Sequence, residues 1–186
     1  LVNPSATYLN LDIELRLQTP AHRSQPTGKF VRLGSGAHLG YGRLLVTTGG
    51  RNRWISVPGV QREGVFGLRT IDDAERIRAA VRAGSRAVVV GIGFIGSEVA
   101  ASLRQLGAEV TAVEHGTAPL GSVLGEQVGK ELAAIHRERG VRLVLGDSVT
   151  SFEGSQRVEQ VRTKGGLTIG CDLAVVGVGI VPNVEL

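Results

Sequence analysis

Methionine is absent from the 186-residue chain, even at position 1, and cysteine occurs only once, as Cys171. An intact translation product begins with methionine unless it is processed, so we expect the chain to be an internal piece of a longer protein or an incompletely recorded sequence. A single cysteine can form neither an internal disulfide nor a CxxC redox pair. We therefore expect Cys171 to pack as a small apolar residue at the start of a strand.

Long apolar runs and blocks of like charge are also absent. The apolar runs are too short to cross a bilayer, and no basic segment followed by an apolar core marks a signal peptide at the N-terminus. The net charge is +4, but the basic residues are scattered among acidic ones and do not alternate with aromatic residues. The pattern predicts a cytoplasmic protein without a membrane or nucleic-acid partner, and it carries no signal of oligomeric state.

Residues 87–114 are the most informative stretch that is present. An apolar, β-branched run at 87–90 is typical of a parallel strand buried on both faces. A segment with apolar residues at helical intervals follows, and a second strand ends at Glu114. Between the first strand and the helix stand three glycines with the spacing G-x-G-x-x-G: Gly91, Gly93 and Gly96.

This strand–glycine–helix–strand order predicts a dinucleotide-binding βαβ unit. The first glycine permits the tight turn, the second lets the backbone approach a pyrophosphate, and the third lets helix and strand pack closely. A ribose-binding acid belongs at the end of the second strand, where Glu114 stands 18 residues after Gly96. Because a carboxylate there accepts hydrogen bonds from ribose hydroxyls and repels a 2′-phosphate, we expect NADH to be preferred over NADPH. A glycine-rich turn without a ligand is the alternative reading.

The remaining elements are predicted from periodicity and turn residues. Four strands are expected before the first helix, at 11–17, 29–33, 37–39 and 41–47, with a loop at 19–27 and a connector at 51–67. A helix capped by Thr70 is expected to end near Gly84, a loop is expected at 119–125, and a second helix at 126–139. A parallel strand at 141–145, a meander at 149–153, 157–163 and 167–169, and a buried strand at 172–177 complete an α/β fold from residue 69 onward.

The order of these parts resembles a known family. The motifs TTGG, LRTIDDAERIR, VVVGIGFIGSEVAASL, VTAVE and DLAVVGVGIVPN resemble those of the FAD-dependent pyridine nucleotide-disulfide oxidoreductases, and most closely the NADH-dependent ferredoxin, rubredoxin and putidaredoxin reductases. The resemblance implies a partial FAD-binding domain at 1–68, consisting of a β-meander and closing strand, before a Rossmann-like NAD-binding domain at 69–186. It implies hydride transfer from NADH to FAD and onward electron transfer to an acidic ferredoxin or rubredoxin.

The resemblance also implies roles for individual residues. Those matching the NAD loop are Gly91, Gly93, Phe94, Ile95 and Gly96, with Phe94 and Ile95 beside the nicotinamide. Those matching the strand end where nicotinamide and flavin meet are Gly177, Val178 and Gly179. Those matching the FAD side are Thr48, Gly49 and Arg69, although Thr47 stands where the family usually has alanine.

Glu98 matches the family's catalytic-site glutamate near the nicotinamide carboxamide. A carboxylate favoured by the helix dipole also fits Glu98, and a surface arginine before a helix is the alternative for Arg69. No grouping of His, Ser or Cys typical of acid–base or nucleophilic catalysis is present, and no metal site is assigned.

The FAD half of the family pattern is incomplete in this chain. The family's other G-x-G-x-x-G motif and its Gly-Asp segment for the flavin ribityl chain are both missing. We therefore expect the NAD domain to stand alone and the FAD remnant to bind flavin weakly.

Two alternatives to a ferredoxin-reductase fragment stay open. One is a related flavoenzyme, such as the large subunit of NADH-dependent nitrite reductase, an NADH oxidase or a disulfide reductase. The other is an NADH-binding module without turnover.

Overall fold

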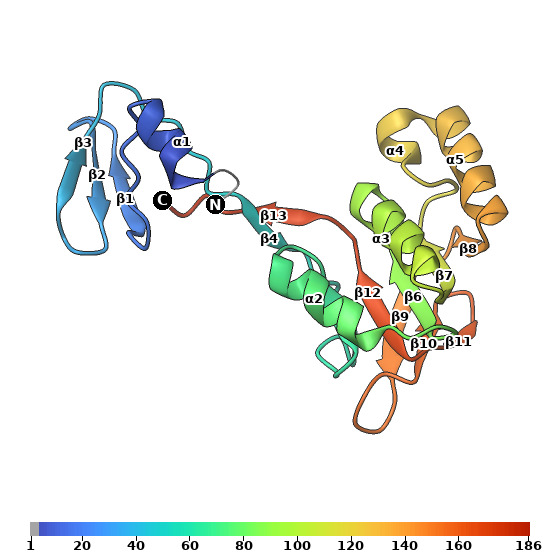
Figure 1. Cartoon of the computed structure of the whole chain (residues 1–186). Helices are drawn as coiled ribbons and strands as arrows, with labels where there is room; N and C mark the ends of the chain where they lie inside the picture. Colours follow the sequence, from blue (N-terminus) through green and yellow to red (C-terminus); the bar gives the residue numbers. More distant parts are fainter. Residues whose placement is uncertain (1–3) are drawn as a thin grey trace. The chain divides into compact units, whose positions relative to one another are not determined.

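The computed structural model describes residues 4–186, which divide into two compact units (Figure 1). The smaller unit holds the residues up to Gly49 together with Pro182–Leu186, and the larger unit is Gly50–Val181. The chain therefore passes between the units twice, at residues 49–50 and 181–182.

The smaller unit is a short helix and an antiparallel sheet of order β1-β2-β3. Its elements are α1 (Ser5–Asn10), β1 (Ala21–Gln25), β2 (Phe30–Leu33) and β3 (His38–Gly40). The predicted hairpin between β2 and β3 is confirmed, and the amide of Leu33 donates to the carbonyl of Ala37 at 2.8 Å across the turn. Val31 and Leu33 are the buried apolar residues of β2.

Two strands predicted for the smaller unit are wrong. Residues 11–17 and 41–47 form no strand, and apolar residues in both stretches are exposed, including Leu11 at 65% and Leu45 at 84%. Strand β1 forms instead in the stretch expected to be a loop, because it finds β2 as a hydrogen-bonding partner. Alternation of apolar and polar residues stabilises a strand only where a neighbouring strand pairs with it and a core buries its apolar side chains.

The larger unit is built on a parallel five-stranded sheet, which confirms the α/β class. The sheet order is β5-β12-β6-β7-β8, with bounds β5 (Val65–Gly67), β12 (Leu173–Val176), β6 (Arg86–Val90), β7 (Glu109–Glu114) and β8 (Val141–Leu145). Residues 51–67 were expected to be a connector, but they include most of β4 (Gly50–Asn52), which pairs with β13 (Ile180–Pro182), and all of β5. Because β5 pairs with β12, this segment belongs to the sheet.

The sheet is covered on both faces, and β6 shows this most clearly. Ala87 and Val89 pack in a buried cluster with side chains of α2 (Ile71–Ala80) and α3 (Phe94–Gln105). Val88 and Val90 pack in a second cluster on the opposite face with the meander. The meander is β9 (Val149–Glu153), β10 (Gln160–Thr163) and β11 (Thr168–Gly170), paired antiparallel as predicted. An apolar run without alternation is therefore the correct pattern for this strand.

The connection after β7 contains a helix that the sequence reading missed. The stretch 119–125 includes α4 (Gly121–Leu124), followed by α5 (Glu126–Glu138) close to its predicted bounds.

Cys171 is 1% exposed and packs in the meander-side cluster, and burial raises the pKa of its thiol to about 11. Its expected packing role is confirmed. Within residues 4–186, no helix combines the length and the apolar character that a membrane crossing requires.

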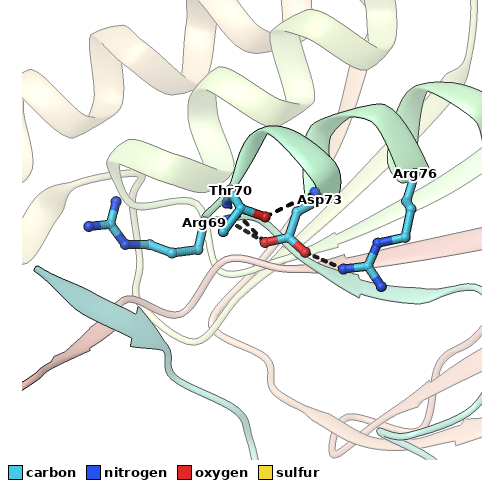
Figure 2. A network of polar contacts seen from close by, with 4 residues as sticks. All are labelled: Arg69, Thr70, Asp73 and Arg76. Atoms are coloured by element: carbon cyan, nitrogen blue, oxygen red, sulfur yellow. Dashed lines mark hydrogen bonds and ion pairs between the residues drawn. The ribbon is translucent and has the colours of Figure 1, made fainter. Parts of the chain in front are cut away.

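Helix α2 begins with a complete capping box (Figure 2). The Thr70 hydroxyl accepts a hydrogen bond from the Asp73 amide at 3.1 Å, and the Asp73 carboxylate accepts from the amides of Thr70 and Arg69 at 3.0 Å each. Arg76 forms an ion pair with the same carboxylate. Burial disfavours ionisation of Asp73, but these hydrogen bonds outweigh it and lower the pKa. The helix starts at its predicted cap and ends at Ala80, earlier than Gly84.

Replacing Thr70 by alanine is expected to lower the free energy of unfolding by about 1 kcal/mol, because the Asp73 amide loses its acceptor. Thr70→Ser keeps a hydroxyl at the same position and serves as the matched control. Urea denaturation of both variants measures the difference. Equal losses of stability in the two variants would show that the hydroxyl is not the important group.

Candidate dinucleotide site

The carboxyl ends of the parallel strands open into a cavity in the larger unit. Its volume is about 550 Å³, which lies within the usual range for small-molecule sites. Ligands of open α/β sheets bind outside the carboxyl ends of the strands, where the strand order changes direction. The predicted site residues that line the cavity are Gly91, Gly93, Phe94, Ile95, Glu114, Gly177, Val178 and Gly179.

The glycine loop after β6 has little room for side chains at one position and free space at another. Gly91 has φ of +82°, in the left-handed region that glycine adopts readily. A Cβ at Gly96 would lie 1.9 Å from the carbonyl oxygen of Gly91, whereas a Cβ at Gly93 would meet nothing within 4 Å. Gly96 therefore allows α3 to pack against β6, and Gly93 leaves an open backbone path toward the cavity.

The N-terminus of α3 follows this loop directly. Gly93 is its N-cap residue and supplies no side-chain cap, and no acidic residue lies in the first turn. The first amides of a helix lack partners inside the helix, and together with the helix dipole they favour an anion. Phe94, the first residue of α3, is 57% exposed while lining the cavity. The loop and helix start thus present amides and an apolar surface to the same space.

Glu114 is held at the cavity by backbone amides from two loops. One carboxylate oxygen accepts from the amide of Ile92 at 2.8 Å, and the other accepts from the amide of Gly116 at 2.8 Å. The ring of His115 lies 3.0 Å from the second oxygen. Burial of Glu114 disfavours its ionisation, but these amides and His115 outweigh burial and lower the pKa. Glu114 is therefore an anion at neutral pH.

The segment after β12 closes against the glycine loop. The amide of Gly177 donates to the carbonyl of Val90 at 2.8 Å, and a Cβ at Gly177 would lie 3.2 Å from the Cα of Gly96. Val178 and Gly179 follow, and Gly179 has φ of +108°. This close approach places the end of β12 beside the start of α3, so that both border the same cavity.

Other predicted site residues lie away from the cavity. Glu98 is exposed on α3 and does not line it. The Arg69 side chain donates to the carbonyl of Gly50 at 2.8 Å, beside the start of α2. Thr48 and Gly49 belong to the smaller unit, where the amide of Asn183 donates to Gly49 at 3.0 Å and the Asn183 side chain donates to Thr48 at 3.0 Å.

The sequence reading missed several residues that line the cavity. They come from the β8–β9 turn and the first residue of β9, from the segment that includes α4, and from the stretch after β4: Asp147, Ser148, Val149, Leu120, Val123 and Ile55. For the residues that follow β8, their place in the sequence could have revealed them. Asp147 follows the third parallel strand, and the carboxyl ends of neighbouring parallel strands meet at one edge of the sheet.

The chain belongs to the pyridine nucleotide-disulphide oxidoreductase family, whose model matches residues 5–186. Over 184 residues it is 40% identical to the probable ferredoxin reductase CtmF of Castellaniella defragrans, covering 98% of this chain and 45% of that protein. It is 35% identical to rhodocoxin reductase of Rhodococcus erythropolis, covering 100% of this chain and 44% of that protein. The chain thus spans about half the length of these curated relatives.

Solved structures show the same similarity. The ferredoxin reductase for the CYP199A2 system from Rhodopseudomonas palustris matches with a TM-score of 0.88 and 34% identity, covering 100% of this chain and 46% of that chain. The putidaredoxin reductase in a covalent complex with putidaredoxin matches with the same TM-score, identity and coverage. The fold expected from the sequence is therefore the fold of these reductases.

Two glycines of the G-x-G-x-x-G motif, Gly96 and Gly93, are expected to respond differently to alanine. Gly96→Ala forces a Cβ against the Gly91 carbonyl and should cost about 3 kcal/mol of stability or more, the upper range for overpacking. Gly93→Ala should change stability by less than about 0.5 kcal/mol, because its Cβ meets open space. Thermal denaturation measures both variants. A Gly96→Ala variant as stable as the unmutated chain would contradict the observed packing.

Proposed function

We propose that this chain is the NADH-binding part of a flavoprotein reductase that passes electrons to a ferredoxin-type iron–sulfur carrier. The observation that carries the proposal is the position of Glu114 at the end of β7, where its carboxylate accepts a hydrogen bond from the amide of Ile92 in the loop that carries Gly91 and Gly93. The names of relatives from several organisms support the redox partner, and so does the matched putidaredoxin complex.

The residues of the cavity fit a dinucleotide. The open space at Gly93 and the uncapped start of α3 would hold the pyrophosphate, and Glu114 would accept hydrogen bonds from the adenosine ribose. Phe94, Ile95 and the residues Gly177–Gly179 would border the nicotinamide and exclude water from it. The bound nicotinamide supplies the hydride, and the protein supplies position and a dry surrounding. Glu98 is exposed on α3 and does not line the cavity, so its proposed place near the carboxamide rests on the family resemblance alone.

The FAD-side residues fit only one edge of a flavin site. Thr48 and Gly49 border a groove of about 480 Å³ in the smaller unit, but their carbonyl oxygens already accept hydrogen bonds from Asn183. Arg69 is likewise bonded to Gly50. In the domain division proposed from the sequence, residues 1–68 are a partial FAD-binding domain and residues 69–186 the NAD-binding domain. Residues 50–67 lie in the larger unit, however, where β5 pairs with β12 and Ile55 lines the NAD cavity. No step through FAD is assigned to this chain by itself.

Binding without turnover is therefore the activity we propose for the 186-residue chain on its own. The NAD cavity lies wholly within the larger unit, whereas the flavin-side residues supply only an edge. Hydride transfer to FAD and electron delivery to an acidic ferredoxin or rubredoxin are proposed for the longer protein. A related NADH oxidase or nitrite reductase would share the same cavity, and the electron acceptor distinguishes these enzymes.

The purified chain is expected to carry almost no flavin. Gel filtration after incubation with excess FAD, followed by the visible absorption spectrum of the protein peak, measures the bound flavin. Because the described residues provide only an edge of the site, we expect far less than one FAD per chain. Flavin bound in a one-to-one ratio would refute the assignment of an incomplete FAD site.

Glu114 is expected to select NADH over NADPH by about 10- to 100-fold, because a 2′-phosphate loses the ribose hydrogen bonds and meets a like charge. The pKa of Glu114 is lowered below 4.5, so the carboxylate and the preference persist at neutral pH. Glu114→Ala should remove most of this preference.

Calorimetric titration of the chain with both nucleotides tests this expectation. Glu109→Ala, an exposed carboxylate at the opposite end of β7, is the matched control and should retain the preference. Equal or tighter binding of NADPH by the unmutated chain would refute Glu114 as the ribose ligand.

A further inference from the structure

Asp147 occupies a turn that joins three parts of the larger unit. It follows β8, lines the cavity together with Glu114, and was not recognised from the sequence. Its carboxylate accepts from the amide of Ser148 at 2.7 Å and from the amide of Gly165 at 2.9 Å. Gly165 lies in the turn between β10 and β11, so this side chain ties the meander to the edge of the parallel sheet.

A second hydrogen bond joins the same two turns. The amide of Lys164 donates to the carbonyl of Ser148 at 2.8 Å. The hydroxyl of Thr163, with the amides of Gly165 and Ser148, lowers the pKa of the Asp147 carboxyl. Asp147 is therefore ionised at neutral pH, and its hydrogen bonds are of the stronger, charge-assisted kind.

The backbone of the Asp147 turn continues the connection to Glu114. The amide of Asp147 donates to the carbonyl of Glu114 at 3.1 Å, and the amide of Gly146 donates to the carbonyl of Gly116 at 2.9 Å. Gly116 in turn donates its own amide to the Glu114 carboxylate. The Asp147 side chain therefore holds the meander, and the Asp147 amide holds the main chain of Glu114. The neighbouring Gly146 continues the connection through Gly116 to the Glu114 side chain.

We propose that Asp147 is a positioning residue that aligns the Glu114 carboxylate and the 115–118 loop for the dinucleotide by fastening the β8–β9 turn to the β10–β11 turn. The inference rests on the proposed function, because it assigns Asp147 a part in NADH binding. The exposed turn amides can be solvated when the carboxylate is removed, so the fold should persist without it. Removing the Asp147 carboxylate should therefore disturb the alignment of Glu114 and leave the fold intact.

NADH titration of the 186-residue chain and its variants tests the proposal. Asp147→Ala should weaken NADH binding about tenfold, the effect of losing a charge-assisted hydrogen bond. Asp147→Asn keeps an acceptor oxygen and should recover most of the affinity. In a Glu114→Ala background, Asp147→Ala should add almost nothing, because residues acting through one another are not additive.

Glu153→Ala is the matched control. Glu153 is a β9 carboxylate of the same meander, where it bonds Arg162 and Gln160 but does not line the cavity. NADH affinity should be unchanged in this variant. An equal loss in Glu153→Ala, an unchanged affinity in Asp147→Ala, or an additive loss in the Glu114→Ala background would overturn the proposal.

Amide hydrogen exchange without nucleotide separates this proposal from the proposed function. Asp147→Ala should speed exchange of the Ile92 and Gly116 amides about tenfold, because both donate to the Glu114 carboxylate. Unchanged exchange at these two amides would overturn the positioning role whether or not NADH binds. Absence of NADH binding by the unmutated chain would refute the proposed function, and the exchange result would still decide the role of Asp147.

Discussion

The close approach of the glycine loop to the end of β12 is the contact on which the larger unit and its cavity depend. A Cβ at Gly96 would lie 1.9 Å from the Gly91 carbonyl oxygen, and a Cβ at Gly177 would lie 3.2 Å from the Cα of Gly96. Side chains at these positions would separate α3, β6 and β12. Because the backbones meet there, the carboxyl ends of the strands converge on one space, at the point where the strand order changes direction.

Backbone amides orient one carboxylate, that of Glu114, at the edge of this cavity. Glu114 receives the amides of Ile92 and Gly116, which belong to the glycine loop and to the loop after β7. The same bonds lower the pKa of Glu114 and hold the two loops together. The same hydrogen bonds therefore fix the two loops and keep a negative charge at this edge of the sheet. A change that loosens either loop also changes the electrostatics of the cavity.

Sequence patterns predicted the larger unit better than the smaller one, and the reason is burial. Residues 87–90 are buried on both faces, so their apolar composition directly reports their environment. Residues 41–47 also contain an apolar run, Leu44 to Val46, yet Leu45 is 84% exposed and no strand forms. In the part of the chain that the structure describes, no strand pairs with that stretch. Strand formation requires such a partner, which composition does not supply.

The sequence by itself determined the βαβ unit, the glycine loop and Glu114, because turn geometry, helix period and strand length are local properties of the chain. Only the tertiary structure showed that β5 joins the sheet beside β12, that Asp147 reaches the cavity, and that Glu98 lies outside it. These results depend on register between strands distant in sequence and on which helix face meets the sheet. Packing between segments determines this register and this helix face, and the sequence of one segment alone does not specify them.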